Sequence, residues 1–326
     1  MIAQLRANIS SDVKEREPLA NHTTFKIGGP AEYFFSAKNA DDATRAARVA
    51  KELNLPLFVF GGGSNMLVSE QGVKGLVVKM VNQEIAFDGK KVIVGAGAPT
   101  GLVAMRTAEA GLTGFEWAVG VPGTIGGAVR GNAGCYGGEI KDVVVSVRVL
   151  ENGEERVMIN AECGFAYRNS IFKREPGRTI ISVTLSLAVS SDASVSKAKL
   201  RQILLDRKEK QPVEYPTAGC MFTNWIPTSE HDVESLRRSL DLDKDENIPR
   251  TPHGNVPAGW IIDRAGLKGM KVGHVKVSEK HGNFFLNDGK ATAGDVVALT
   301  ASIKERVRNM TGGIVQLREE VEYVGF

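Results

Sequence analysis

The spacing of hydrophobic residues along the chain marks a series of predicted helices. Between residues 292 and 309, Val296, Leu299, Ile303 and Val307 recur at three- and four-residue intervals, as on one face of an amphipathic helix. Thr292 and Asp295 have the types and spacing of a capping box at its start. Residues 194–210 are predicted as a second amphipathic helix. Further helices are predicted at residues 39–53, 100–110, 232–240 and 257–265.

Short apolar runs bounded by turn residues predict β-strands. The run at residues 57–60, the helix at 39–53 and an extended segment at 23–30 suggest a βαβ-like unit. Further strands are predicted at residues 66–69, 92–94, 143–150, 155–159, 179–187 and 314–324. A chain of 326 residues is long for a single core. We therefore expect an α+β protein in three parts, with boundaries at residues 1–81, 82–210 and 211–326.

Composition narrows the class of protein. Hydrophobic residues make up 42% and charged residues 24%, which is ordinary for a soluble globular protein. No apolar run approaches 18 residues, and the first 16 residues carry charges where a signal peptide needs its apolar region, so we expect a cytoplasmic protein without a membrane span. The net charge of +3 is too small to indicate nucleic-acid binding. Three cysteines without CxxC spacing and five scattered histidines predict neither a disulfide framework nor a metal site.

Two clusters of glycine carry the strongest chemical signal. Eight of the twenty residues at 119–138 are glycine, a density too high for an ordinary strand or helix. Glycine is used where the backbone takes positive φ or passes close to a ligand. A second cluster, G-G-G-S-N at residues 61–65, follows the strand predicted at 57–60. One cluster alone is as well explained by a surface loop, but the pair favours a cofactor-binding site built from backbone N–H groups.

Two common nucleotide motifs do not fit the second cluster. A Walker loop ends in Gly-Lys-Ser/Thr, whereas Ser64, Asn65 and Met66 follow the glycines here. A dinucleotide fingerprint opens a helix, whereas residues 66–69 are predicted as a strand. A nest of backbone N–H groups, with serine and asparagine as extra partners, remains.

The order of the motifs resembles a known family. G-G-G-S-N at 61–65, G-V-P-G-T-I-G-G-A at 120–128 and N-A-G at 132–134 resemble the FAD-binding fold of vanillyl-alcohol-oxidase-type flavoproteins. Five later blocks are similar, in order, to those of the UDP-N-acetylenolpyruvoylglucosamine reductase family. They are F-A-Y-R-N-S-I-F-K (165–173), A-G-C-M-F-T-N (218–224), A-G-W-I-I-D-R-A-G-L-K-G (258–269), K-H-G-N-F-F-L-N (280–287) and L-R-E-E-V-E-Y-V-G (317–325).

The resemblance, which covers nearly the whole chain, implies a fold, cofactors and a reaction. It implies a two-subdomain FAD-binding fold (1–81 and 82–210) followed by an α+β substrate-binding domain (211–326). It implies non-covalent FAD, NADPH as co-substrate, and reduction of UDP-N-acetylglucosamine enolpyruvate to UDP-N-acetylmuramate for peptidoglycan synthesis. We expect a monomer or weak oligomer whose partner is this UDP-sugar. The implied flavin-binding residues are Gly61, Gly62, Gly63, Ser64, Asn65, Gly120, Pro122, Gly123, Thr124, Gly126 and Gly127.

The same resemblance assigns three catalytic residues. Arg168 corresponds to the arginine that binds the substrate carboxylate, and a guanidinium suits this role because it can bind a carboxylate through two hydrogen bonds. Glu320 corresponds to the catalytic glutamate. Cys220 stands where most members carry a proton-donating serine, and a thiol is a stronger acid than an alcohol. Tyr167 and Asn224 are the implied substrate-binding residues.

Two departures from the family pattern leave alternatives open. Thr223 and Trp225 stand where lysine and proline are usual, so a substrate-phosphate contact from this lysine is in doubt. The first alternative is a flavin oxidase of the same fold, against which the order of Arg168, Cys220 and Glu320 argues. The second is a flavin-binding protein without turnover. Fold alone does not separate these functions.

Overall fold

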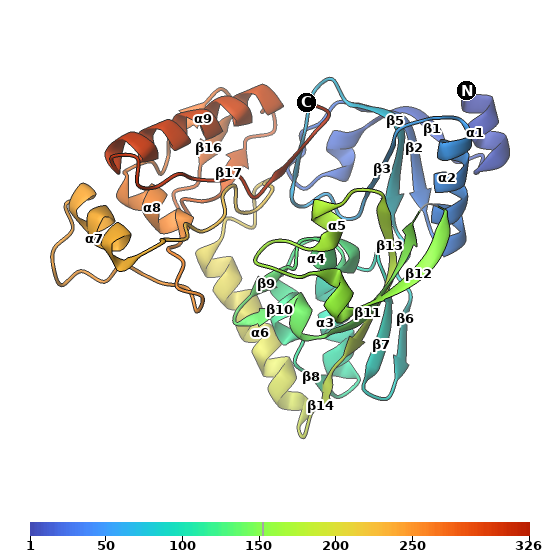
Figure 1. Ribbon diagram of the computed structural model, residues 1–326, viewed down its shortest axis with the longest axis horizontal. Coiled ribbons are helices and arrows are strands. Elements are labelled where there is room, and N and C mark those ends of the chain that lie inside the picture. The colour runs from blue at the N-terminus through green and yellow to red at the C-terminus, as the bar shows by residue number, and fades with distance from the viewer. Residues whose placement is uncertain (152) are drawn as a thin grey trace. The chain divides into compact units, whose positions relative to one another are not determined.

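The computed structural model describes residues 1–151 and 153–326, which form two compact units (Figure 1). Unit 1 comprises residues 1–18, 30–63 and 73–207. Unit 2 comprises residues 19–29, 64–72 and 208–326. Each unit is therefore built from three separate stretches of chain. The domain boundaries predicted from the sequence stay a prediction.

The first sheet of unit 1 has the strand order β1-β2-β5-β3. Its strands are β1 (Lys14–Pro18), β2 (Pro30–Ala37), β5 (Val73–Met80) and β3 (Leu57–Phe60). Strands β2 and β3 both run parallel to β5, and β1 is antiparallel to β2. Helix α2 (Ala40–Glu52) connects β2 to β3, which confirms a βαβ-like unit. The predicted extended segment at 23–30 is wrong, because β2 begins only at Pro30.

The second sheet of unit 1 is antiparallel throughout, with the order β12-β11-β13-β7-β6. Strands β11 (Val144–Glu151), β12 (Glu154–Ile159) and β13 (Arg178–Ser186) confirm the three strands predicted between residues 143 and 187. Buried residues of α3 (Thr100–Glu109) and α4 (Ile125–Arg130) belong to the same hydrophobic core as β7, β11 and β13. The other elements lying in unit 1 are α1 (Ile2–Asn8), β6 (Ile85–Asp88), β7 (Lys91–Gly95), β8 (Leu112–Thr113), η2 (Glu116–Gly120), β9 (Gly134–Cys135), β10 (Gly138–Glu139), η3 (Ile140–Asp142), η4 (Asn160–Cys163), α5 (Ile171–Arg174) and β14 (Ala188–Val189), while α6 (Ala193–Lys210) ends three residues into unit 2.

Helix α4 corrects one expectation from the glycine pattern. It runs through the cluster at 119–138, where the glycine density predicted no regular helix. Gly126 and Gly127 are helical, and the N–H of Gly126 donates to the carbonyl oxygen of Ala96 at 2.9 Å. A Cβ on Gly126 would lie 3.0 Å from the Cβ of Ala96. Close packing of α4 therefore accounts for this glycine.

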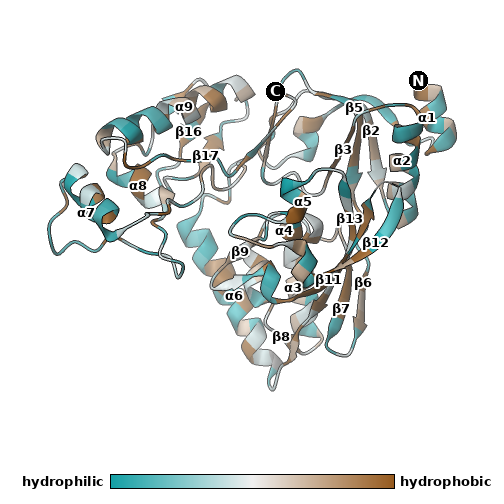
Figure 2. Ribbon diagram, in the orientation of Figure 1, coloured by the Kyte–Doolittle hydropathy of each residue, from teal (hydrophilic) through white to brown (hydrophobic). Residues whose placement is uncertain are grey.

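Unit 2 packs three helices with short strands around one core. Helix α9 (Ala293–Met310) is capped as predicted, because the hydroxyl of Thr292 accepts the N–H of Asp295 at 3.0 Å. Figure 2 shows both hydrophobic and hydrophilic residues along α9, whose predicted apolar stripe is buried. The other elements are η1 (Leu19–His22), β4 (Met66–Val68), α7 (Glu230–Ser239), α8 (Ala258–Arg264), β15 (Lys271–Val272), β16 (Val275–Val277), β17 (Phe285–Asn287) and β18 (Glu322–Val324).

The last predicted strand is much shorter than expected. Only β18 (Glu322–Val324) is a strand within residues 314–324, and it runs parallel to β4 (Met66–Val68). Residues 315 and 317 are buried without pairing in a sheet, so their apolar side chains explain the overextended prediction. The pairing with β4 brings the C-terminal segment next to the end of the G-G-G-S-N motif.

Candidate active site

The two glycine clusters meet inside unit 1. A Cβ on Gly62 would lie 2.7 Å from the Cα of Gly123, and a Cβ on Gly61 would overlap Oγ1 of Thr124. Gly123 itself has a φ of +97°, which favours glycine. Glycine is therefore required for the two loops to touch, and segments far apart in the sequence become neighbours.

The residues at this contact fit a flavin dinucleotide. Within the part of the chain that the structure describes, Oγ1 of Thr124 is buried without a hydrogen-bond partner. A buried hydroxyl left unpaired is costly, so a ligand that accepts its hydrogen bond would stabilise the site. Hydroxyl and backbone N–H donors suit a diphosphate, the anionic part of FAD.

Helix α6 supports the glycine cluster at residues 119–138 within unit 1. The guanidinium of Arg207 donates to the carbonyl oxygen of Gly120. A Cβ on Gly120 would lie 3.4 Å from Ile203 and 3.2 Å from the ring of Tyr136. The loop is thus held by a charged hydrogen bond and by packing on both sides.

Arg168 sits at the tip of a two-residue hairpin. The N–H and carbonyl groups of Ala166 and Asn169 bond each other at 2.9 and 3.0 Å, which leaves Tyr167 and Arg168 as the turn. Arg168 has a φ of +53°, an uncommon conformation for a side chain of its size. Its guanidinium donates to the carbonyl oxygen of Gly134 at 3.1 Å and lies 5.5 Å from the centre of the Tyr167 ring.

Two buried polar residues fix this hairpin to α4 and the loop after it. The Ser170 hydroxyl donates to the carbonyl oxygen of Arg130 at 2.6 Å. The amide of Asn132 donates to the carbonyl oxygen of Ala166 at 3.0 Å. Because both partners belong to the glycine-rich stretch, the hairpin that carries Arg168 and the predicted flavin loop form one assembly.

Cys220 and Glu320 come from adjacent segments of unit 2. Phe222 pairs with Glu319 in an antiparallel bridge, and the N–H of Glu320 donates to the carbonyl oxygen of Met221 at 2.8 Å. On the other side, Cys220 pairs with Phe284. The segment that carries the thiol is therefore held between the segment that carries the carboxylate and the K-H-G-N-F-F-L-N block.

Asn65 links the G-G-G-S-N motif to the segment of Glu320. Its side-chain amide donates to the carbonyl oxygen of Glu320 at 3.1 Å. Its own carbonyl oxygen accepts the N–H of Glu322 at 3.0 Å. The side chain and the carbonyl oxygen of Asn65 thus hold the end of the motif against the segment of Glu320 within unit 2.

The side chains of Asn224 and His281 each accept a hydrogen bond from a backbone N–H group. Oδ1 of Asn224 accepts the N–H of Ala258 at 3.2 Å, at the start of α8. Nδ1 of His281 accepts the N–H of Asn283 at 3.2 Å, and its ring packs edge-on against Phe284. Burial lowers the pKa of His281, which favours the neutral imidazole that can accept this bond.

Burial changes the acidity of two of the three cysteines. All are free thiols. Burial raises the pKa of Cys135 to about 11, and burial raises the pKa of Cys163 to about 11 as well. Because the thiolate is the reactive form, these two thiols are poor nucleophiles near neutral pH.

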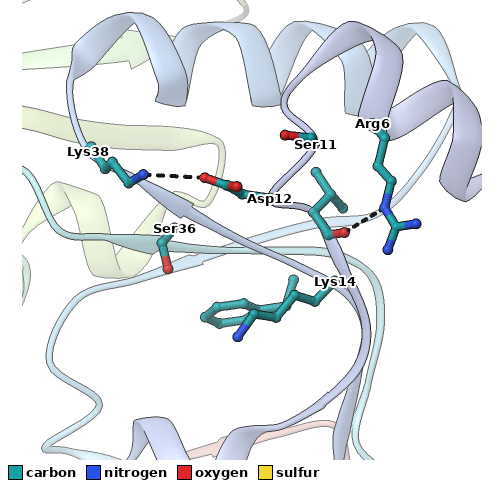
Figure 3. Close-up of a pocket in the computed structure, with 8 residues that line it drawn as sticks. Arg6, Ser11, Asp12, Lys14, Ser36 and Lys38 are labelled. Atoms are coloured by element: carbon teal, nitrogen blue, oxygen red, sulfur yellow. Dashed lines mark hydrogen bonds and ion pairs between the residues drawn. The ribbon is translucent and has the colours of Figure 1, made fainter.

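Two surface cavities lie away from the predicted residues. One, of about 430 Å³, lies in unit 1 beside α1, β1 and β2, where Lys38 pairs with Asp12 and Arg6 donates to the carbonyl oxygen of Val13 (Figure 3). The other, of about 230 Å³, is lined by residues 226–230, 250 and 253–255 of unit 2. Neither cavity contains a residue predicted to bind flavin or substrate.

The described residues offer neither a metal site nor a membrane-spanning helix. Across residues 1–151 and 153–326, no group of histidine, cysteine and acidic side chains could hold a metal ion. Within these same ranges, no helix has both the length and the apolar character needed to cross a membrane.

Three buried polar residues that hold the site segments were not predicted from the sequence. Asn283, Asn132 and Ser170 are buried and bond backbone groups of the site segments. Their partners lie between 34 and 61 residues away in the sequence. All three residues stand inside the quoted motif blocks, and this placement is a signal that could have drawn attention to them.

Two stretches of the chain match known family models. Residues 31–159 match the FAD binding domain. Residues 211–324 match the C-terminal domain of UDP-N-acetylenolpyruvoylglucosamine reductase. The two matches fall in the parts that carry the flavin-type loops and Cys220 with Glu320, respectively.

Full-length relatives extend the match to the whole chain. The UDP-N-acetylenolpyruvoylglucosamine reductase of Lachnoclostridium phytofermentans is 37% identical over 100% of this chain and 97% of its own. That of Caldanaerobacter subterraneus subsp. tengcongensis is 38% identical over 95% of this chain and 92% of its own. The crystal structure of the enzyme from Thermus caldophilus superposes with a TM-score of 0.75 at 31% identity, covering 95% and 98% of the two chains. The chain therefore belongs to the UDP-N-acetylenolpyruvoylglucosamine reductase family.

Proposed function

We propose that this protein reduces UDP-N-acetylglucosamine enolpyruvate to UDP-N-acetylmuramate with NADPH as reductant and non-covalent FAD as cofactor. The observation that carries the proposal is the full-length relationship to reductases of this name, together with the family's motif blocks around Arg168, Cys220 and Glu320. FAD, when bound, supplies hydride chemistry. The product is a precursor of peptidoglycan.

The residues proposed to bind FAD are those of the two glycine clusters. Thr124 offers a buried hydroxyl without a partner in the described chain, and the glycines let backbone approach the cofactor closely. The proposed set is Gly61, Gly62, Gly63, Ser64, Asn65, Gly120, Pro122, Gly123, Thr124, Gly126 and Gly127.

The chemistry of the substrate gives each catalytic residue a role. Hydride added to the terminal carbon of the enol ether leaves negative charge on the carbon next to the carboxylate. Arg168 binds that carboxylate, and Glu320, in its protonated form, donates a hydrogen bond to the developing charge. Cys220 then gives its proton to the carbanion, and the thiolate regains a proton from solvent. Tyr167 and Asn224 contact the substrate beside Arg168 and Cys220, respectively.

The proposal extends to the location, oligomeric state and binding partners of the enzyme. We propose a cytoplasmic monomer or weak oligomer that binds its UDP-sugar and no nucleic acid. Thr223 offers a hydroxyl where the family usually has lysine, so we expect weaker electrostatic binding of the substrate diphosphate at this position.

Half-reactions separate the proposed reductase from the oxidase and from a protein without turnover. NADPH added anaerobically to the yellow protein should bleach the flavin absorbance, and the enolpyruvyl substrate should restore it. Recovery with oxygen but not with substrate would identify an oxidase. No bleaching by NADPH, with FAD bound, would leave only a binding function.

A glycine substitution tests the flavin loops. Gly62→Ala places a methyl group where the Cα of Gly123 is 2.7 Å away, so the two loops must separate. We expect the purified variant to contain little FAD, measured by absorbance after denaturation. Gly131→Ala is the matched control, because its Cβ would make only an ordinary contact at 3.6 Å. Full FAD content in Gly62→Ala would exclude this loop contact from the binding site.

A further inference from the structure

The side chain and the backbone carbonyl group of Asn283 bond the segment that carries Cys220. Its side-chain amide donates to the carbonyl oxygen of Phe222 at 2.8 Å, and its Oδ1 accepts the N–H of the same residue at 2.9 Å. Its backbone carbonyl oxygen accepts the N–H of Met221 at 2.8 Å. Its N–H donates to Nδ1 of His281. The side chain thus pairs with Phe222 as a neighbouring strand would.

The same short segment is bonded to that of Glu320 on its other side. Met221 accepts the N–H of Glu320 at 2.8 Å, and the N–H of Thr223 donates to the carbonyl oxygen of Arg318 at 2.9 Å. Both backbone groups of Phe222 are used by Asn283, while the groups of Met221 are divided between Asn283 and Glu320. A shift at Asn283 is therefore passed to Cys220 and Glu320 through one or two peptide units.

The hydrogen bonds between Asn283 and Phe222 lie in the interior of unit 2. Asn283 is 2% exposed, and Phe222 is fully buried. Without the amide, the N–H and carbonyl groups of Phe222 would lack partners in a place that water does not reach, so the segment would have to move to satisfy them. Catalysis is sensitive to such movement, because a displacement of about 1 Å can cost about a hundredfold in rate.

We infer that Asn283 is a positioning residue that holds the segment of Cys220 in register with that of Glu320. The inference rests on the proposed reductase function and adds a residue to it. Asn283 need not touch substrate or flavin; it sets where the proton donor and the carboxylate stand. Reduction of the flavin by NADPH uses neither group, so only the substrate half-reaction depends on Asn283.

Asn287 provides a matched control in the same block. It is also buried, at 1% exposure, and its amide donates to the carbonyl oxygen of Phe25 at 2.9 Å. Its Oδ1 accepts the N–H groups of Gly289 and Ala291. None of these partners belongs to the segments of Cys220 or Glu320. Its replacement removes a comparable buried amide and should lower stability without displacing the thiol or the carboxylate.

The test measures both half-reactions of the FAD-loaded full chain by stopped-flow absorbance, below the unfolding temperature of each variant. For Asn283→Ala we expect unchanged bleaching by NADPH and reoxidation by the enolpyruvyl substrate slowed by about ten- to a hundredfold. Asn287→Ala should show a lowered unfolding temperature and near-normal rates. If Asn283→Ala does not fold, Asn283→Asp takes its place, since the isosteric carboxylate keeps the acceptor for Phe222 and loses the donor.

Two results would overturn the inference. One is equal reoxidation rates in the Asn283 and Asn287 variants, which would make Asn283 structural only. The other is slowed bleaching or lost FAD in the Asn283 variant, which would place its effect at the flavin. Failure of the proposed function itself is distinguishable, because then the unmodified protein would not be reoxidised by substrate.

Discussion

Arg168→Ala is expected to leave bleaching by NADPH largely intact and to slow reoxidation by the enolpyruvyl substrate by about a hundredfold or more. The reason is that the guanidinium stabilises charge that appears only when the substrate accepts hydride. Loss of one such stabiliser costs about a hundred- to a thousandfold. The measurement is single-turnover absorbance of the flavin with each partner added in turn.

The surroundings of Arg168 provide a control for this prediction. Arg174 lies six residues further along and donates to the carbonyl oxygen of Gly164 at 3.0 Å, as Arg168 does to Gly134. Arg174→Ala should leave both half-reactions near normal. Equal slowing of both half-reactions in Arg168→Ala would instead indicate a disturbed hairpin or weakened flavin binding.

Glu320→Gln is expected to show the same separation between half-reactions. The amide keeps the size of the side chain, but it is a weaker hydrogen-bond donor than a carboxylic acid and therefore stabilises the developing charge less. Glu319→Gln is the neighbouring control, because Glu319 pairs with Lys304 at 2.8 Å on the exposed side. A larger loss in Glu319→Gln than in Glu320→Gln would mean that the family's glutamate was assigned to the wrong position.

Helices with local start and stop signals could be predicted from the sequence. The capping box at Thr292 and the apolar stripe from Val296 place α9 to within one residue at its C-terminal end. For α2, Asn39 caps the helix by accepting the N–H of Asp42, and acids lie early and bases late. These signals lie within a few residues of the helix they define, so tertiary contacts did not override them.

Strands that depend on distant partners could not be predicted as well. Strand β18 is three residues long, as is its partner β4, which lies more than 250 residues earlier in the sequence. Strand β5, the central partner of both β2 and β3, contains Gly75 at a φ of +81°, and a glycine inside a strand weakens its local signal. Pairing across such separations leaves little trace in local hydrophobic spacing.

The candidate site shows the same difference between local sequence signals and contacts over long sequence separations. The glycine clusters and the motif blocks pointed to Gly62, Arg168, Cys220 and Glu320 without coordinates. The pairing of the Asn283 amide with Phe222 could not be predicted, because a single sequence does not distinguish a buried asparagine from an exposed one. The roles assigned to these residues stay predictions, and Cys220 offers the sharpest test of them.

Cys220→Ser is expected to stay active, since a hydroxyl occupies nearly the same position and serves as proton donor in most of the family. Cys220→Ala should retain bleaching by NADPH and lose about a hundred- to ten-thousandfold in reoxidation by substrate, the usual contribution of a general acid. Single-turnover absorbance again separates the two steps. A fully active Cys220→Ala variant would mean that water or another residue delivers the proton.

A thiol at this position should also make the enzyme sensitive to oxidants and alkylating reagents. Cys135 and Cys163 have pKa values raised to about 11 by burial, so they react slowly and leave Cys220 as the expected target. We expect a thiol-directed reagent to abolish reoxidation by substrate, bound substrate to protect against it, and Cys220→Ser to resist it. Equal sensitivity of Cys220→Ser would instead place the reactive thiol at another cysteine.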